Sequence, residues 1–105
     1  MPPERVKRVS PETIRGIFNH SQCSEKISNG YLVPQILRDN ILQNPNLKGE
    51  PPGTRSQTIR YSDLGGQWVV VIHQYLRPDG SLGTSGKPDP KRLRINDTIF
   101  LSNDS

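Results

Sequence analysis

The sequence contains no alanine, a single cysteine, few aromatic residues and no long apolar run. Because alanine is the strongest helix former, its absence, together with 9 glycines and 10 prolines, predicts that helix is a minority element. The run from Trp68 to Ile72 is too short to cross a bilayer, and no charged start followed by an apolar segment marks a secretion signal. We therefore expect a soluble protein that does not contact a membrane.

The scarcity of cysteine also restricts the redox setting and the metal chemistry. Cys23 cannot form an internal disulfide, and a small exported domain more often carries several cysteines, so a cytoplasmic location is favoured. His20, Cys23 and His73 are the only soft ligands, and the spacing of the first two lacks the second pair that a zinc site requires. We expect no metal and no cofactor.

Length and charge predict one small basic domain. The 105 residues fit a single core, and the formal net charge is +4. Such a charge favours encounters with nucleic acids and other polyanions, although it also serves solubility alone in many proteins. Residues 1–9 are predicted to be a flexible basic arm, residues 10–102 a single α+β domain, and residues 103–105 a disordered tail.

Two short helices are predicted before the strands. Ser10 and Pro11 are typical of an N-cap and a first helical residue, and a helix from Pro11 to about Asn19 would bury three apolar side chains on one face. These are Ile14, Ile17 and Phe18. Residues 19–29 are predicted to be a loop, and a second helix is predicted to begin at Pro34 and end at Asn44.

The second half of the chain has the pattern of a sheet. Alternating residues predict a strand over Thr58–Ser62, and Gln67–Leu76 predicts a long central strand that is apolar on both faces. Strands over Arg92–Ile95 and Thr98–Leu101 flank an Asn-Asp pair suited to a tight hairpin turn. The expected fold is therefore α+β: an antiparallel sheet of about four strands with two N-terminal helices packed on one face.

The loop from Arg77 to Lys91 is a candidate anion site. It does not match the phosphate loop of nucleotide triphosphatases, because Ser81 stands where that motif needs glycine and Pro88 where it needs a hydroxyl. Its first part, Pro78 to Gly80, predicts a chain reversal. Its second part offers backbone N–H groups at residues 84–86 beside cations, which suits phosphate oxygens; the alternative is a plain solvated connection.

The parity of the long strand places His73, Tyr75 and Arg77 on one side. An imidazole, a phenol and a guanidinium supply a base for a 2′-hydroxyl, an acid for the leaving oxygen and a cation for the phosphorane charge. This set of parts resembles that of small ribonuclease toxins, which implies RNA cleavage without a metal. The alternative is that His73 is a hydrogen-bonded strand histidine and Tyr75 a packed aromatic.

The remaining cations of the second half are the candidate phosphate contacts. The segment from Arg55 to Arg94 contains seven cations and three anions. Those predicted to bind nucleic acid are Arg60, Lys87, Lys91, Arg92 and Arg94. The sequence therefore predicts a small RNA-binding protein, with a ribonuclease of toxin type as the more specific form. The alternative is a non-enzymatic interaction or inhibitory module that docks on a partner protein through its Pro/Gly-rich loop or a sheet edge.

Overall fold

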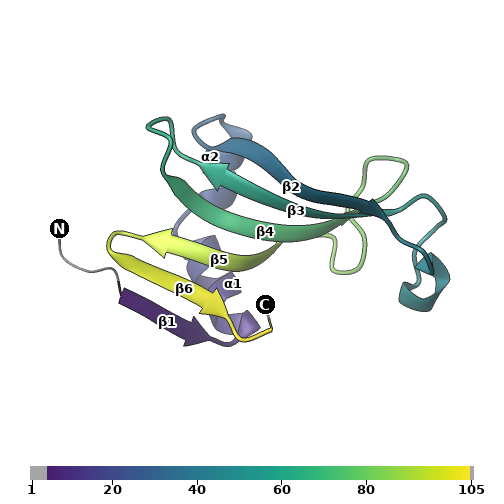
Figure 1. Ribbon diagram of the computed structural model, residues 1–105, viewed down its shortest axis with the longest axis horizontal. Coiled ribbons are helices and arrows are strands. Elements are labelled where there is room, and N and C mark those ends of the chain that lie inside the picture. Colours follow the sequence, from purple (N-terminus) through teal and green to yellow (C-terminus); the bar gives the residue numbers. More distant parts are fainter. Residues whose placement is uncertain (1–4, 105) are drawn as a thin grey trace.

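The computed structural model describes residues 5–104 and shows one sheet with two α-helices on one of its faces (Figure 1). The elements in chain order are β1 (Arg5–Val9), α1 (Pro11–His20), α2 (Cys23–Ser28), β2 (Val33–Ile41), the 3-10 helix η1 (Pro45–Lys48), β3 (Arg55–Ser62), β4 (Trp68–Leu76), β5 (Asp89–Ile95) and β6 (Thr98–Ser102). The α+β class is confirmed.

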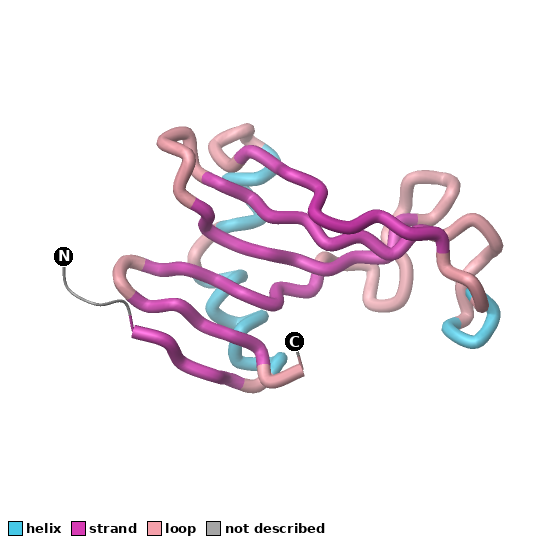
Figure 2. The backbone as a smooth tube through the Cα atoms, viewed as in Figure 1, coloured by secondary structure: helices cyan, strands magenta, loops and turns pink. Residues whose placement is uncertain are grey.

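The sheet has six strands in the order β1-β6-β5-β4-β3-β2. Strands β2 to β6 form an antiparallel meander, and β1 pairs in parallel with β6. The prediction of a purely antiparallel sheet of about four strands is therefore wrong in number and in kind. In the tube view short turns join β3 to β4 and β5 to β6, whereas long loops join β2 to β3 and β4 to β5; β1 reaches β6 from the opposite end of the chain (Figure 2).

The additional edge strands lie where the sequence predicted other structure. Arg5–Val9 is not an arm, because it pairs with Thr98–Ser102 along its whole length; residues 1–4 lie outside the described part. At the other end of the chain, the Asn103 N–H donates to the Val9 carbonyl, so the predicted disordered tail is wrong at this residue, while Ser105 lies outside the described part.

The prediction of a helix from Pro34 is wrong, because this segment forms β2, an edge strand. Apolar residues spaced by three and four positions would form one buried face of a helix. In the structure no such face is buried, because Ile36 and Leu37 are about half exposed. Pro34 has no N–H to donate to the sheet, which an edge strand tolerates. The second helix, α2, instead occupies part of the segment predicted to be a loop.

The first helix is confirmed. The Ser10 Oγ accepts a hydrogen bond from the Thr13 N–H at 3.2 Å, as expected of an N-cap. Ile14 and Phe18 are buried and Ile17 is partly buried, so the predicted apolar face of α1 is the one that meets the sheet.

The core lies between the helices and one face of the sheet. From the sheet it takes Ile59, Val70, Ile72 and Leu93, and from the first part of the chain Ile14, Phe18, Cys23 and Leu32. Neighbouring residues of a strand point to opposite faces, so the residues between these strand positions point away from both helices. We call this second side of the sheet the open face; it faces the viewer in Figure 1, with α1 and α2 behind the sheet.

The two predicted β-turn regions are confirmed where the structure describes them. Asn96 takes a positive φ of 55° in the turn between β5 and β6. Leu82 forms an isolated antiparallel bridge with Leu76, so the chain folds back immediately after β4. Within residues 5–104, no helix is long and apolar enough to cross a membrane.

Candidate nucleic-acid interface

A row of three arginines crosses the open face. Val71 of β4 pairs with Arg60 on one side and with Arg92 on the other, and Arg92 pairs with Leu101, which pairs with Arg8. Cross-strand partners share a face of the sheet, so guanidinium groups alternate with apolar side chains across five strands. We call Arg8, Arg60 and Arg92, with Val71 and Leu101 between them, the arginine row.

Further side chains extend this row into a hollow. A depression of about 730 Å³ on the open face is lined by residues that include Arg38, Arg60, Trp68 and Arg92. Arg94 lies beside it, with its Cζ 4.7 Å from the centroid of the Trp68 ring, a cation–π arrangement. Three of the five cations predicted to bind nucleic acid, Arg60, Arg92 and Arg94, therefore lie on one face, joined by Arg8 and Arg38, which the sequence did not single out.

Three of these arginines, Arg38, Arg60 and Arg92, have no carboxylate partner within the described residues. Arg60 donates from Nη2 to the Gln35 amide oxygen, a neutral partner. A face with several cations and few anions attracts a polyanion along its whole width.

The other two predicted cations are placed differently. Lys91 lines the hollow, but its Nζ is 2.9 Å from a carboxylate oxygen of Asp89 and 2.9 Å from one of Asp104. Lys87 does not line the hollow; it lies in a smaller cleft at the end of β4. The structure therefore separates the predicted binding residues into two groups.

His73 and Tyr75 lie together beyond the arginine row. The His73 Nε2 is 2.8 Å from the Ser56 Oγ, and the rings of His73 and Tyr75 meet edge to face with centroids 4.7 Å apart. Burial lowers the pKa of His73 below its usual value of 6.5; nearby Lys91 lowers it further, while Asp89 opposes this shift. His73 is therefore mainly neutral at pH 7.

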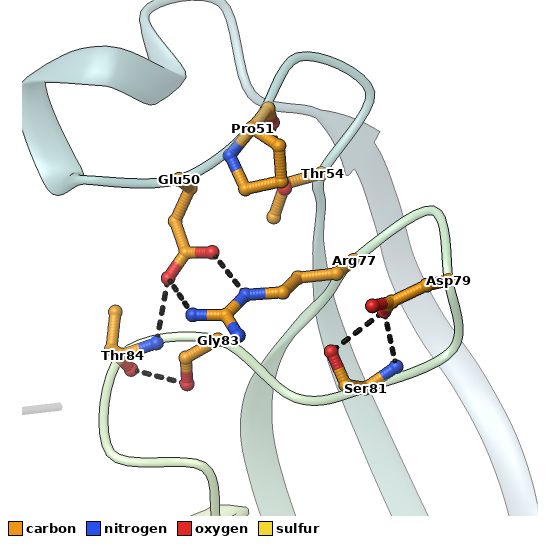
Figure 3. Close-up of polar contacts among 8 residues, drawn as sticks. All are labelled: Glu50, Pro51, Thr54, Arg77, Asp79, Ser81, Gly83 and Thr84. Carbon is orange, nitrogen blue, oxygen red and sulfur yellow. Dashed lines mark hydrogen bonds and ion pairs between the residues drawn. The ribbon is translucent and has the colours of Figure 1, made fainter.

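Arg77 does not join these two side chains, because its guanidinium is bound to Glu50 (Figure 3). The Arg77 Nε donates to Glu50 Oε2 at 2.7 Å, and the Thr84 N–H donates to Glu50 Oε1 at 2.7 Å. The Glu50 side chain is only 1% exposed. The second part of the loop thus binds an anion, but that anion is a carboxylate of the same chain.

Gly83 is required by this arrangement. A Cβ atom on Gly83 would lie 2.4 Å from Glu50 Oε1, which is too close for any non-bonded contact. Nothing in the local sequence around Glu50 marks it as a partner of Arg77, since the two are 27 residues apart. We call Glu50, Arg77 and the Thr84 N–H the loop anchor.

The smaller cleft, of about 200 Å³, lies between the end of β4 and the anchored loop. Its lining includes Arg15, His73, Tyr75, Ser85, Lys87 and Asp89. The loop predicted to bind an anion and the predicted catalytic pair therefore meet at one place. Arg15 comes from α1, and sequence reasoning missed it because it is an ordinary exposed helix residue.

Replacing Glu50 by glutamine is expected to lower the thermal midpoint at pH 7 more than replacing Asp39 by asparagine. Both carboxylates pair with an arginine, but Asp39 and its partner Arg55 are 30% and 41% exposed, so solvent screens that pair. Differential scanning calorimetry of both variants measures the difference, and equal shifts would contradict a role for the buried anchor.

The stabilisation that Glu50 provides has a defined pH dependence. Hydrogen bonds from Arg77 and then from the Thr84 N–H hold the pKa of Glu50 below its usual 4.5. A lowered folded-state pKa stabilises the fold above pH 4.5, and this stabilisation is lost as the pH falls through the folded-state value. The difference between wild type and Glu50→Gln should therefore shrink below pH 4.5, and a constant difference would exclude ionised Glu50 as its source.

Among residues 5–104, no group of three or more His, Cys, Asp or Glu side chains is arranged to hold a metal ion. Comparison of the chain with protein-family models, with curated proteins and with solved structures finds no match.

Proposed function

We propose that the protein binds single-stranded RNA on the open face of its sheet. The observation that carries this proposal is the arginine row, three guanidinium groups spaced by apolar side chains on a face that neither helix covers. Strands are about 4.8 Å apart, so successive arginines of the row are separated by about 10 Å. Phosphates would contact the guanidinium groups, and bases would pack on the surfaces between them.

The shape of the face favours a single strand over a duplex. Reading a duplex groove requires a projecting helix or two-stranded ribbon, but α1 and α2 both lie on the opposite side of the sheet (Figure 1). A single strand exposes its bases, which stack on aromatic rings and on guanidinium planes. The pair formed by Arg94 and Trp68 offers such a plane beside the hollow.

The salt dependence of RNA binding tests this proposal. A fluorescent single strand of about 12 nucleotides, with 2′-O-methyl groups so that it cannot be cut, is titrated with the protein at several salt concentrations. Five arginine contacts predict a slope of about −3.5 in log affinity against log salt, because each phosphate contact on a single strand contributes about −0.7. No binding, or an affinity that is flat in salt, would contradict the proposal.

One observation supports docking on a partner protein instead. Strand β2 is a sheet edge with exposed apolar residues, among them Val33 at 49% and Ile41 at 59%. An unpaired edge of this kind accepts a further strand. However, Pro34, the charges of Arg38 and Asp39, and a register shift between Ile36 and Arg38 all discourage such pairing. A single partner protein that stays bound after nuclease treatment would favour docking.

A further inference from the structure

The cleft at the end of β4 exists because β4 extends further than β5. His73 is paired with Asp89, the first residue of β5, so the following residues of β4 have no partner in that strand. The loop between the two strands crosses at this level, held by the loop anchor and by a hydrogen bond from the Gly83 N–H to the Tyr75 carbonyl at 2.8 Å. The resulting space opens beside His73 and Tyr75.

We propose that this cleft cleaves RNA: it holds the scissile phosphate between Arg15 and Lys87, with His73 as the general base and Tyr75 as the general acid. This inference rests on the proposed RNA binding, since the open face would deliver the strand to the cleft. It adds Arg15 to the residues expected from the sequence, and it omits Arg77, whose guanidinium is bound to Glu50.

Charge in the cleft favours a phosphate. Within the described residues Lys87 forms no ion pair, and Arg15 forms one, with Glu12 at 3.7 Å, in which both side chains are well exposed. We call Arg15 and Lys87 the cleft cations. The carboxylate of Asp89 is the one anion in the lining, and its Oδ2 is paired with Lys91 at 2.9 Å. The cleft therefore keeps net positive charge for the phosphorane.

Besides its pairing with Lys91, the Asp89 carboxylate acts on His73 as a positioning residue. Its Oδ1 is buried and has no hydrogen-bond partner among residues 5–104, and Asp89 is the direct cross-strand neighbour of His73. A buried acceptor without a donor is costly. Once His73 has taken up a proton, both of its ring nitrogens are donors, and the Asp89 carboxylate stabilises the cation that forms.

The reaction is an intramolecular transesterification at phosphorus. The ribose 2′-oxygen attacks phosphorus while its proton passes to His73, and the bond from phosphorus to the 5′-oxygen breaks as that oxygen takes the proton of the Tyr75 hydroxyl. The products are a 2′,3′-cyclic phosphate end and a 5′-hydroxyl end. Transfer of one proton from His73 to Tyr75 through solvent then restores both side chains, and no co-reactant is consumed.

His73 is in the protonation state that a general base requires. Burial lowers the pKa of His73, Lys91 and Lys48 lower it further, and Asp89 raises it. The other groups near His73 are Tyr75 and the cleft cations. The net shift is downward, so the neutral form that accepts a proton dominates at pH 7. The cleavage rate is expected to rise with pH and to reach half of its plateau below pH 6.5.

The test uses the full chain and an end-labelled single-stranded RNA. Cleavage should leave 2′,3′-cyclic phosphate ends, and a strand with 2′-O-methyl groups should bind but remain intact. His73→Gln is expected to lower the cleavage rate by about 10² to 10⁴-fold, and Tyr75→Phe by about 10²-fold or more. Lys87→Met should also slow cleavage, whereas the matched control Lys26→Met, on the exposed surface of α2, should not.

The outcomes separate this inference from the proposed function. If the 2′-O-methyl strand binds but RNA is not cut, or if His73→Gln cuts as fast as the wild type, the cleft proposal is overturned and RNA binding stands. Equal cleavage would also identify a contaminating ribonuclease, because the variant is purified in the same way. If the 2′-O-methyl strand does not bind, both proposals fail.

Discussion

A variant in which Arg38, Arg60 and Arg92 are all replaced by glutamine is expected to bind single-stranded RNA about 100-fold more weakly than the wild type at 0.1 M salt. The three side chains line the hollow on the open face. Each phosphate contact on a single strand contributes about 0.7 to the salt slope, so between 0.1 M and 1 M salt each is worth about fivefold in affinity. Fluorescence anisotropy with a 2′-O-methyl strand measures the loss.

The matched control removes the same charge from elsewhere. Arg5 and Lys7 pair with Thr98 and Phe100, positions whose side chains point away from the open face, and Lys26 lies on α2. Replacing these three by glutamine also lowers the net charge by three, so a general electrostatic effect would weaken binding equally in both variants. Equal losses would show that the open face is not the binding surface. Unchanged thermal midpoints would confirm that both variants are folded.

Replacing Leu93 by alanine is expected to have the largest effect on stability, a loss of about 2–5 kcal/mol in the free energy of unfolding. Leu93 is fully buried, and β5 is the strand against which α1 packs most extensively. A domain of this size is stable by about 5–15 kcal/mol in total, so the variant would be close to unfolding at moderate temperature. Urea denaturation followed by circular dichroism measures the change.

Leu47→Ala is the control for this variant. Leu47 is 81% exposed, and its truncation should change stability by less than about 0.5 kcal/mol. If the two variants were equally stable, Leu93 would not lie between the sheet and the helices. Leu93 and Arg92 point to opposite faces, so folded Leu93→Ala protein should retain its RNA affinity.

The elements that the sequence predicted correctly are those whose structure is determined by residues close together in the chain. The Ser10 cap and its apolar stripe predict α1, and the continuous apolar run Trp68–Ile72 predicts a central strand. The turn residues at Asn96 predict the last hairpin. In each case the pattern, the turn chemistry and the burial agree.

The two edge strands could not be predicted in this way. An edge strand is buried on neither face here, so β1 and β2 lack the apolar alternation that identifies a strand; four of five residues in β1 are exposed. The spacing of apolar residues in β2 fits a helix as well as a strand. Pairing with other strands decides the structure of both segments: β2 pairs with β3, and β1 pairs with β6 at the far end of the chain.

The candidate site was predicted in part. Strand parity is a local property, and it places Arg92 and Arg94 together, and His73 with Tyr75. Arg8 and Arg38 come from segments predicted to be an arm and a helix, and Arg15 comes from the exposed surface of α1. The pairing of Arg77 with Glu50 joins two loops. Long-range contacts of this kind leave no signal in a single sequence.

The salt slopes of the wild type and of the triple arginine variant, measured side by side on the same 2′-O-methyl strand, give the sharpest test of binding by the open face. Loss of three phosphate contacts should make the slope shallower by about 2, while the control variant without Arg5, Lys7 and Lys26 keeps the slope of the wild type. A slope that is the same in all three proteins would contradict binding by the arginines of the open face.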